Sequence, residues 1–140
     1  TSLDVTIQAQ YLKLLKDIQR DSDLSLIFIT HDFGIVAKMC DRVAVMYAGR
    51  IAEIADVRDL FNNPAHPYTE ALMRSVPNVD EEVEYLYSIE GQPPALDNLP
   101  PGCTFAPRCP YVFDRCNEAF PDLIQVGDRH SATCWKLAGK

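Results

Sequence analysis

The spacing of apolar residues predicts an amphipathic helix near the start of the chain. Ile7, Tyr11, Leu14 and Ile18 recur at steps of three and four, which places them on one helical face. Asp4 stands just before this pattern and is able to cap the free backbone N–H groups of the first turn. A short polar patch follows and ends the pattern. The first segment is therefore expected to be a helix with one apolar side.

A run of seven mostly apolar residues follows, from Leu24 to Thr30. It is rich in β-branched and aromatic residues and short for a helix, so it predicts a strand buried on both faces. His31 would stand at the carboxyl end of this strand, where open α/β sheets bind ligands. On its own this signal is weak, because a single histidine in a connecting loop is more often a surface or packing residue.

Beyond His31 the pattern changes every few residues, which indicates a series of short helices and strands. Two of the predicted strands form a hairpin, because Ala48-Gly49 supplies a turn between them. Asp32 is able to cap the helix that follows His31, and Asp56 the helix after the hairpin. The predicted elements are a helix over about 33–39, strands over 42–47 and 50–55, a helix to about residue 61 and a helix over about 69–75.

From Asp80 the character of the chain changes. An acidic run over residues 80–84 is expected to be a solvated linker, and it precedes a segment rich in proline and cysteine over about 91–136. Little helical or strand period is visible there. Such a segment buries too little apolar surface by itself and needs a cross-link. The sequence thus predicts an α/β fold followed by a small irregular extension.

Composition and charge exclude several classes of function. With 140 residues and 47% apolar content, the chain is large enough to form a core. No apolar run approaches the roughly 18 residues needed to cross a bilayer, and residues 1–20 lack the pattern of a signal peptide. The formal charge of −7, from 20 acidic and 13 basic residues, argues against nucleic acid as a partner.

Four of the five cysteines form a group near the end of the chain. Cys103, Cys109, Cys116 and Cys134 follow the spacing C-x5-C-x6-C-x17-C. Four thiolates complete a tetrahedral zinc site or hold a four-iron cluster, although zinc sites more often contain a C-x2-C pair. Loop thiols and disulfides are the alternative interpretations, and the lack of a secretory signal disfavours the disulfides. Cys40 is expected to be a small buried apolar residue.

Several segments occur in an order that resembles the C-terminal half of an ABC-transporter ATPase subunit. In that family the first segment resembles the D-loop and the second contains the switch histidine, while the later strands close the nucleotide-binding domain. The resemblance implies the C-terminal portion of a P-loop NTPase domain, over residues 1–62. The segments are Thr1-Ser2-Leu3-Asp4, Ile29-Thr30-His31-Asp32, Asp41 to Met46 and Gly49 to Glu53.

The following segments resemble the oligopeptide and dipeptide importer branch of this family. Phe61 to Thr69, with the sequence FNNPAHPYT, is similar to the junction after the nucleotide-binding domain in that branch. Gly91-Gln92-Pro93-Pro94 and the final cysteines are similar to its C-terminal extension. The resemblance therefore implies a helical junction and linker over residues 63–90, and an extension with a four-cysteine metal site over residues 91–140.

The resemblance implies roles for two residues and a set of partners. His31 would be the switch histidine that contacts the γ-phosphate of ATP, and Asp4 would lie at the seam with a second ATPase subunit. ATP and Mg²⁺ are implied as cofactors of an intact ATPase that powers peptide uptake. Permease subunits in the membrane are implied as partners, an extracytoplasmic peptide-binding protein as an indirect one, and the cytoplasmic face of the cell membrane as the location.

The same resemblance implies that the four grouped cysteines bind a [4Fe-4S] cluster. Zinc is the alternative, and His130 could then substitute as a ligand, since only three residues separate it from Cys134. Arg108 lies among these cysteines, where it either offsets their negative charge or is a solvated surface residue. His66 is expected to serve structure, because a His-Pro-Tyr turn fixes the chain direction before a helix.

No G-x-x-x-x-G-K-[ST] phosphate loop occurs in the sequence. We therefore expect the chain to be a fragment of a longer protein that does not hydrolyse ATP by itself, with exposed sheet edges that favour dimerisation. Two rival interpretations stand beside this one. The first is a free-standing iron–sulfur or zinc module that regulates or docks, and the second is the ATPase of a related importer of nickel or another small solute.

Overall fold

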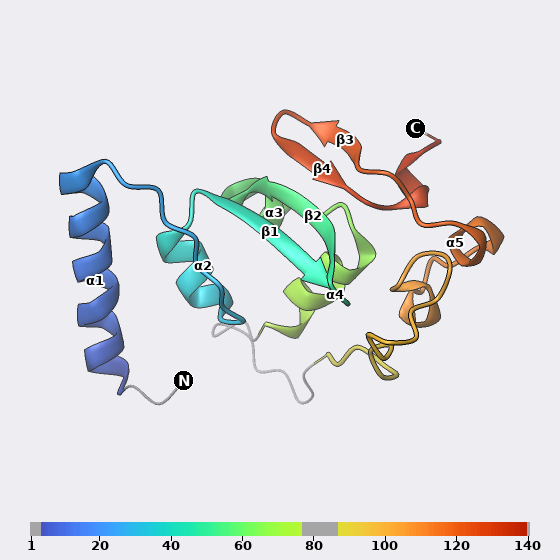
Figure 1. Ribbon diagram of the computed structural model, residues 1–140, viewed down its shortest axis with the longest axis horizontal. Helices are drawn as coiled ribbons and strands as arrows, with labels where there is room; N and C mark the ends of the chain where they lie inside the picture. The colour runs from blue at the N-terminus through green and yellow to red at the C-terminus, as the bar shows by residue number, and fades with distance from the viewer. Residues whose placement is uncertain (1–3, 77–86, 140) are drawn as a thin grey trace. The chain divides into compact units, whose positions relative to one another are not determined.

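The computed structural model describes residues 4–76 and 87–139 and divides the chain into two compact units. The first unit is Thr1–Cys40 and the second is Asp41–Lys140. The acidic run at residues 80–84 and the first three residues of the D-loop-like segment lie outside the described residues. Each unit is described by itself (Figure 1).

The first unit contains two helices whose starts are capped by aspartates, as predicted. Helix α1, Val5–Ser22, begins after Asp4, whose carboxylate accepts a hydrogen bond from the Thr6 backbone N–H at 3.4 Å. Helix α2, Phe33–Met39, begins after Asp32, whose carboxylate accepts from the Ile35 N–H at 3.1 Å. A carboxylate at this position satisfies N–H groups that the helix itself leaves free.

The strand predicted over residues 24–30 is wrong. This segment has no regular secondary structure, and the side chains of Ile27 and Ile29 are 92% and 96% exposed. A strand requires a neighbour for its backbone N–H and C=O groups, and no described strand pairs with this segment. His31 therefore follows an extended, exposed segment and does not stand at the end of a buried strand.

The second unit is built on the predicted hairpin. Strand β1, Arg42–Tyr47, pairs antiparallel with strand β2, Arg50–Asp56. The two turn residues, Ala48 and Gly49, have φ values of 46° and 76°. Two successive residues with positive φ twist the turn in the same sense as the flanking strands, which suits a tight hairpin.

Two further strands from the cysteine-rich segment extend this sheet. Strand β3, Ile124–Gly127, and strand β4, His130–Ala132, form a second hairpin, and β4 pairs antiparallel with β2. The strand order is β1-β2-β4-β3, so the hairpins lie side by side (Figure 1). The sequence did not predict these strands. The structure thus shows an α/β chain with an antiparallel sheet, and the P-loop portion of the fold class stays a prediction.

Short helices surround the sheet. Asp56 precedes α3 as predicted, but its side chain makes no cap hydrogen bond and instead accepts from the Arg129 guanidinium at 3.1 Å. Helix α4 begins two residues earlier than predicted, with the His66 imidazole as its cap. The helical elements of this unit are α3 (Val57–Asn62), α4 (Pro67–Ser75), α5 (Asp114–Glu118) and the 3-10 turns Ala106–Arg108 and Trp135–Leu137.

Phe105, which is 1% exposed, connects the cysteine-rich segment to the hairpin core. Its ring meets the Tyr47 ring edge to face, with 5.2 Å between centroids, and lies 5.4 Å from the Tyr68 ring of α4. In the neighbouring core cluster, Leu60 of α3 packs on Val45, and Tyr68 packs against both clusters. Aromatic pairs of this geometry add to the stabilisation from area burial. The extension therefore shares a core with β1, β2 and α4.

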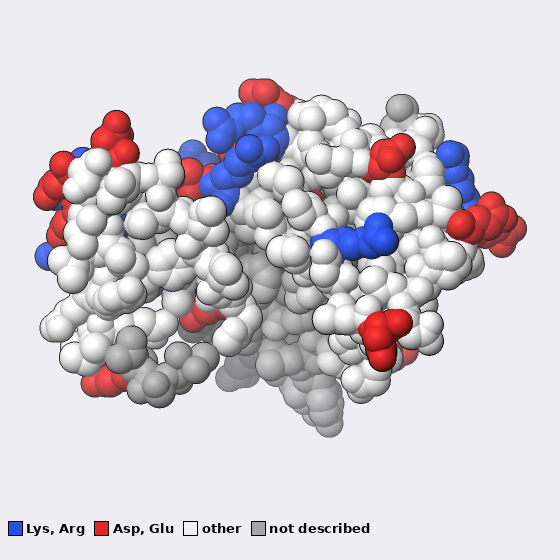
Figure 2. Space-filling model, in the orientation of Figure 1, with Lys and Arg blue, Asp and Glu red and all other residues white. Residues whose placement is uncertain are grey.

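The surface of the described residues carries no broad cluster of one charge on the face shown in Figure 2. Acidic and basic side chains stand there in small separate groups between wide uncharged areas. None of the helices in the described parts of the chain is long and apolar enough to cross a membrane.

Gly102 is required where two parts of the cysteine-rich segment cross. A Cβ atom at this position would lie 2.2 Å from the backbone oxygen of Cys116, and the next residue, Cys103, donates its N–H to that oxygen at 2.7 Å. We expect Gly102→Ala to lower the free energy of unfolding by about 1–3 kcal/mol, because the backbone must move apart. Gly139→Ala is the matched control, since its Cβ meets nothing within 4 Å. Equal urea midpoints for the two variants would contradict this expectation.

Candidate functional site

The four grouped cysteines line one cavity of the second unit. Its empty space, open solvent included, is about 330 Å³. The cavity wall also contains aromatic side chains and, among its described residues, no acidic one. The lining residues include Cys103, Cys109, Cys116, Cys134, His66 and Lys136. Residues up to 31 positions apart in the sequence thus present thiols to a single space.

Backbone N–H groups point at three of the four sulfurs. Cys103 accepts from the N–H groups of Phe105 and Ala106, Cys109 from that of Tyr111, and Cys134 from that of Lys136. Burial raises the pKa of each of these three thiols, that of Cys134 to about 11. Hydrogen bonds to sulfur favour the thiolate, whereas burial without a positive partner favours the thiol. The cavity thus has donors placed for thiolates, and one positive charge, that of Lys136, which lowers the pKa of Cys109 but does not outweigh the effect of burial.

The cysteines are grouped more loosely than a single metal ion requires. Within the described ranges, no three His, Cys, Asp or Glu side chains are close enough to hold one ion. Zn²⁺ with four sulfur ligands at 2.3 Å would need sulfur atoms about 3.8 Å apart. The donor chemistry therefore fits a thiolate-bound group, but the described side chains are not arranged as a ready-made site for one ion.

His66 forms one wall of the cavity and is a neutral imidazole. Its Nδ1 accepts a hydrogen bond from the Tyr68 backbone N–H at 3.0 Å, which leaves the other ring nitrogen to donate to the Thr133 backbone. Burial lowers its pKa to about 4, although the Glu53 carboxylate and the Thr133 backbone act in the opposite direction. His66 therefore both starts α4 and connects the junction to the chain beside Cys134.

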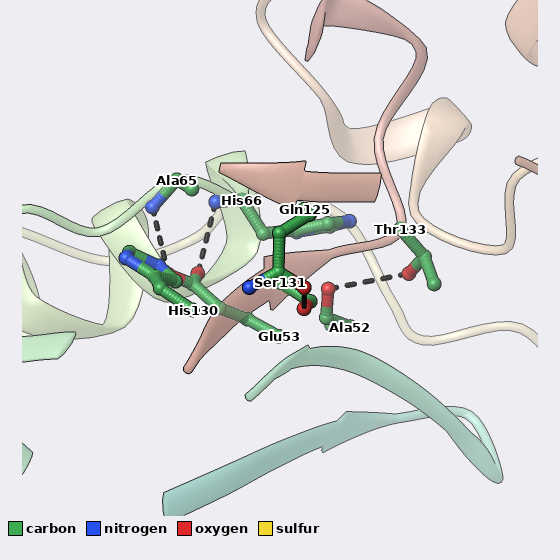
Figure 3. A network of polar contacts seen from close by, with 8 residues as sticks. All are labelled: Ala52, Glu53, Ala65, His66, Gln125, His130, Ser131 and Thr133. Atoms are coloured by element: carbon green, nitrogen blue, oxygen red, sulfur yellow. Dashed lines mark hydrogen bonds and ion pairs between the residues drawn. The ribbon is translucent and has the colours of Figure 1, made fainter. Parts of the chain in front are cut away.

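Glu53 is a fully buried carboxylate in strand β2, with 0% of its surface exposed. Its Oε1 accepts from the Ala65 N–H at 2.8 Å and contacts His130 Nε2 at 2.7 Å, and its Oε2 accepts from the His66 N–H at 2.9 Å. Figure 3 shows these groups converging on the carboxylate from two segments, the junction and strand β4. A buried charge is tolerated only with such partners. Glu53 thus connects strand β2, the junction and strand β4.

The structure places His130 beside Glu53, and it does not line the cysteine cavity. Strand β4 continues into Thr133. The Thr133 N–H donates to the Ala52 carbonyl at 2.8 Å, and the Thr133 hydroxyl donates to the Ile51 carbonyl, also at 2.8 Å. This strand end, part of which appears in Figure 3, leads directly to Cys134. The contacts of β4 with β2 therefore fix where Cys134 enters the cavity.

Arg108 is neither a free surface residue nor one that lines the cavity. Its guanidinium donates to the backbone carbonyls of Ile89 and Glu90, each at 2.8 Å, and to the Tyr47 hydroxyl at 3.2 Å. Its side chain also lies near Gly91, which has a φ of 76° and at which a Cβ atom would stand 3.6 Å from the Arg108 Cγ. Arg108 therefore holds the chain that enters the extension against the hairpin.

The structure does not bring the two predicted nucleotide-site residues together. Asp4 caps α1, and His31 is an exposed residue between the extended segment and Asp32. Both belong to the first unit, whereas the four cysteines belong to the second. The proposed roles of Asp4, His31 and the cysteines stay predictions.

Sequence reasoning missed Glu53 as a site residue. One signal was available, because Glu53 interrupts the otherwise small and apolar stretch Ile51 to Ala55. A charged residue in a strand that forms the core is almost never fully buried unless it is paired. Its partners at residues 65, 66 and 130 could not be read from the sequence.

Comparison with known proteins identifies the class. Residues 52–116 match the family described as the oligopeptide/dipeptide transporter, C-terminal region, which covers β2, the junction and three of the four cysteines. With the relatives below, this match shows that the chain is similar to the ATP-binding proteins of oligopeptide and dipeptide transporters, over a stretch that includes their C-terminal region.

The relatives agree over nearly the whole chain. It is 52% identical to the dipeptide transport ATP-binding protein DppD of Bacillus subtilis, over 96% of the chain and 40% of the relative. It is 49% identical to the oligopeptide transport ATP-binding protein AppD of the same organism, over 96% of the chain and 41% of the relative. The OppD protein of Salmonella typhimurium is also 49% identical, over 97% of the chain and 40% of the relative. The chain thus spans about two fifths of the length of these relatives.

The lowered pKa of His66 predicts a loss of stability in mild acid. Between pH 6.5 and 4 the unfolded chain binds a proton at this histidine that the folded chain does not, so the stability contribution is complete above pH 6.5 and falls below it. The difference of 2.5 pKa units corresponds to about 3 kcal/mol at pH 4. We expect His66→Asn, whose side-chain oxygen still caps α4, to lack this loss in urea unfolding.

The exposed residue His31 provides the control. His31→Asn should retain the pH dependence of the unmodified chain, since it removes a histidine that is open to solvent. Parallel stability curves for the unmodified chain and His66→Asn would show that His66 is not the group responsible.

Proposed function

We propose that this chain is part of the ATP-binding subunit of an ABC importer that couples ATP hydrolysis to the uptake of oligopeptides or dipeptides. The observation that carries the proposal is the 52% identity to a dipeptide transport ATP-binding protein over 96% of the chain. The ordered segments from Asp4 through His31 to the hairpin support it. The ATPase activity belongs to the complete protein, and the peptide cargo is inferred from the printed names of the relatives.

In this proposal His31 acts on the γ-phosphate of ATP. Phosphoryl transfer depends mostly on positioning and on charge stabilisation, so an imidazole that donates to a phosphate oxygen contributes without forming a covalent bond. Two features support this role. His31 is exposed, and the hydrogen bond from the Asp32 N–H to the Thr30 hydroxyl at 3.0 Å shapes the backbone on either side of it.

The proposal also assigns partners. Asp4 lies at the seam with a second ATPase subunit, and Mg²⁺ accompanies ATP at that seam. Permease subunits carry the peptide across the membrane, and an extracytoplasmic binding protein delivers it to them. The ATP-binding subunit accordingly works at the cytoplasmic face of the membrane.

Replacement of His31 tests the ATPase proposal. In the complete protein assembled with its permease, His31→Ala should reduce ATP turnover by about 10²-fold or more, as expected for the loss of one preorganised donor. Lys38→Ala is the control, because Lys38 is exposed on the neighbouring helix α2. ATP turnover by His31→Ala equal to that of the control would contradict the assigned role.

We further propose that Cys103, Cys109, Cys116 and Cys134 bind a [4Fe-4S] cluster, with zinc as the alternative. Support comes from the single cavity that the four thiols line and from the N–H groups directed at three of the sulfurs. A [4Fe-4S] cluster and a tetrahedral zinc ion use the same four thiolate ligands, so the cavity is compatible with both. Such a group supplies the positive charge that thiolates need, and Lys136 adds a further one nearby.

Metal analysis of serine variants tests this proposal. The protein purified without oxygen should contain about four iron atoms and four sulfide ions per chain. Replacement of any one of the four cysteines by serine should sharply reduce this content, whereas Cys40→Ser should keep it, because Cys40 lies outside the cavity. If the protein contains stoichiometric zinc and no iron, the site binds zinc and not a cluster. No bound metal of either kind would refute the metal site.

A further inference from the structure

We propose that Glu53 is a positioning residue of the four-cysteine site: through Ala65, His66 and His130 its buried carboxylate holds two walls of the cavity at a fixed separation. The inference rests on the proposed metal site and deepens it. Glu53 touches neither the cysteines nor the cavity, so its effect passes through the residues that it binds.

The first wall is the junction before α4. His66 and Pro67 both line the cavity, and the Glu53 carboxylate accepts the backbone N–H groups of Ala65 and His66. Two hydrogen bonds from successive N–H groups to the two oxygens of one carboxylate fix both the position and the direction of this turn. A shift of the carboxylate would therefore shift the junction wall.

The second wall is the chain that follows β4. Cys134, Trp135 and Lys136 line the cavity, and only three residues separate Cys134 from His130. His130 is buried, with its Nε2 atom 2.7 Å from Glu53 Oε1. The carboxylate oxygen that receives the Ala65 N–H is thus the one that His130 contacts, so one atom connects both walls.

Local contacts show why this connection is needed. β4 is only three residues long, and two register pairs and the hydrogen bonds of the following Thr133 join it to β2. Cys103 and Cys109 belong to the segment that Phe105 and Arg108 attach to the hairpin, and Cys116 lies in α5. Of the four cysteines, Cys134 is therefore the one whose position depends most on β4. Within β4, His130 is the residue that the charged side chain of Glu53 contacts.

The test is the rate at which a chelator removes iron from the protein after anaerobic reconstitution with iron and sulfide. We expect Glu53→Gln and His130→Ala to release iron at least about 10-fold faster than the unmodified chain, as is common when residues that orient metal ligands are lost. In Glu53→Gln the side-chain NH2 takes the place of one carboxylate oxygen. It then faces a backbone N–H, so the hydrogen bond to that oxygen is lost. Circular dichroism reports in parallel whether each variant is folded.

Three further variants separate positioning from a general loss of stability. The double variant Glu53→Gln/His130→Ala should release iron no faster than the faster single variant, because both changes break the same connection. His130→Gln, which keeps an N–H for the carboxylate, should restore a rate close to that of the unmodified chain. Asp17→Asn is the matched control, since it removes a partly exposed carboxylate of α1 that is paired with Arg20.

The outcomes are distinct. If the unmodified chain binds no metal, the proposed site fails and the inference fails with it. If it binds iron and both single variants release iron at its rate, the inference alone is overturned. Should Glu53→Gln not fold, His130→Ala decides the question, because it leaves the carboxylate and its two backbone hydrogen bonds in place. Additive effects in the double variant would also overturn the inference.

Discussion

The buried carboxylate of Glu53 needs hydrogen-bond donors, and this need determines which segments of the second unit pack together. Glu53 has no exposed surface, and a charge removed from water costs several kcal/mol unless it is paired and hydrogen-bonded. The chain supplies donors from the junction and from strand β4, so these segments must meet at strand β2 before the unit is complete. Hydrogen bonds to a charged group contribute about 1.5–3 kcal/mol each, which makes their arrangement more decisive than that of most neutral contacts.

This constraint explains why the cysteine-rich segment packs as part of the hairpin unit. Phe105 enters the aromatic core around Tyr47, and Arg108 binds the backbone carbonyls at residues 89 and 90. These contacts attach the beginning of the segment, and Glu53 attaches its end through His130. A loop-rich segment with little core of its own is thereby held at both ends, and its thiols face a common cavity without a disulfide among the described residues.

The sequence correctly predicted those elements that depend on interactions between residues close together in the chain. Asp4 and Asp32 cap their helices because the cap depends on residues two or three positions away, and Ala48-Gly49 turns the hairpin for a similar reason. The grouping of the cysteines followed from their spacing and from a family resemblance. Glu53 and His130 are 77 residues apart, and no periodicity reports a contact at that separation. The strand expected before His31 is wrong because apolar content indicates burial without naming a partner strand.

The two units differ in how complete their chemistry is. In the second, the thiols, their N–H donors and the residues that position them all belong to this chain. In the first, the apolar stripe of α1 and the side chains of Ile27 and Ile29 are exposed, and extended apolar surfaces of this kind mark places where another surface packs. Under the proposed function that surface belongs to the nucleotide-binding domain, and His31 gains its role from the phosphates that the domain binds. The cysteine cavity is therefore the site that this stretch of chain forms from its own residues.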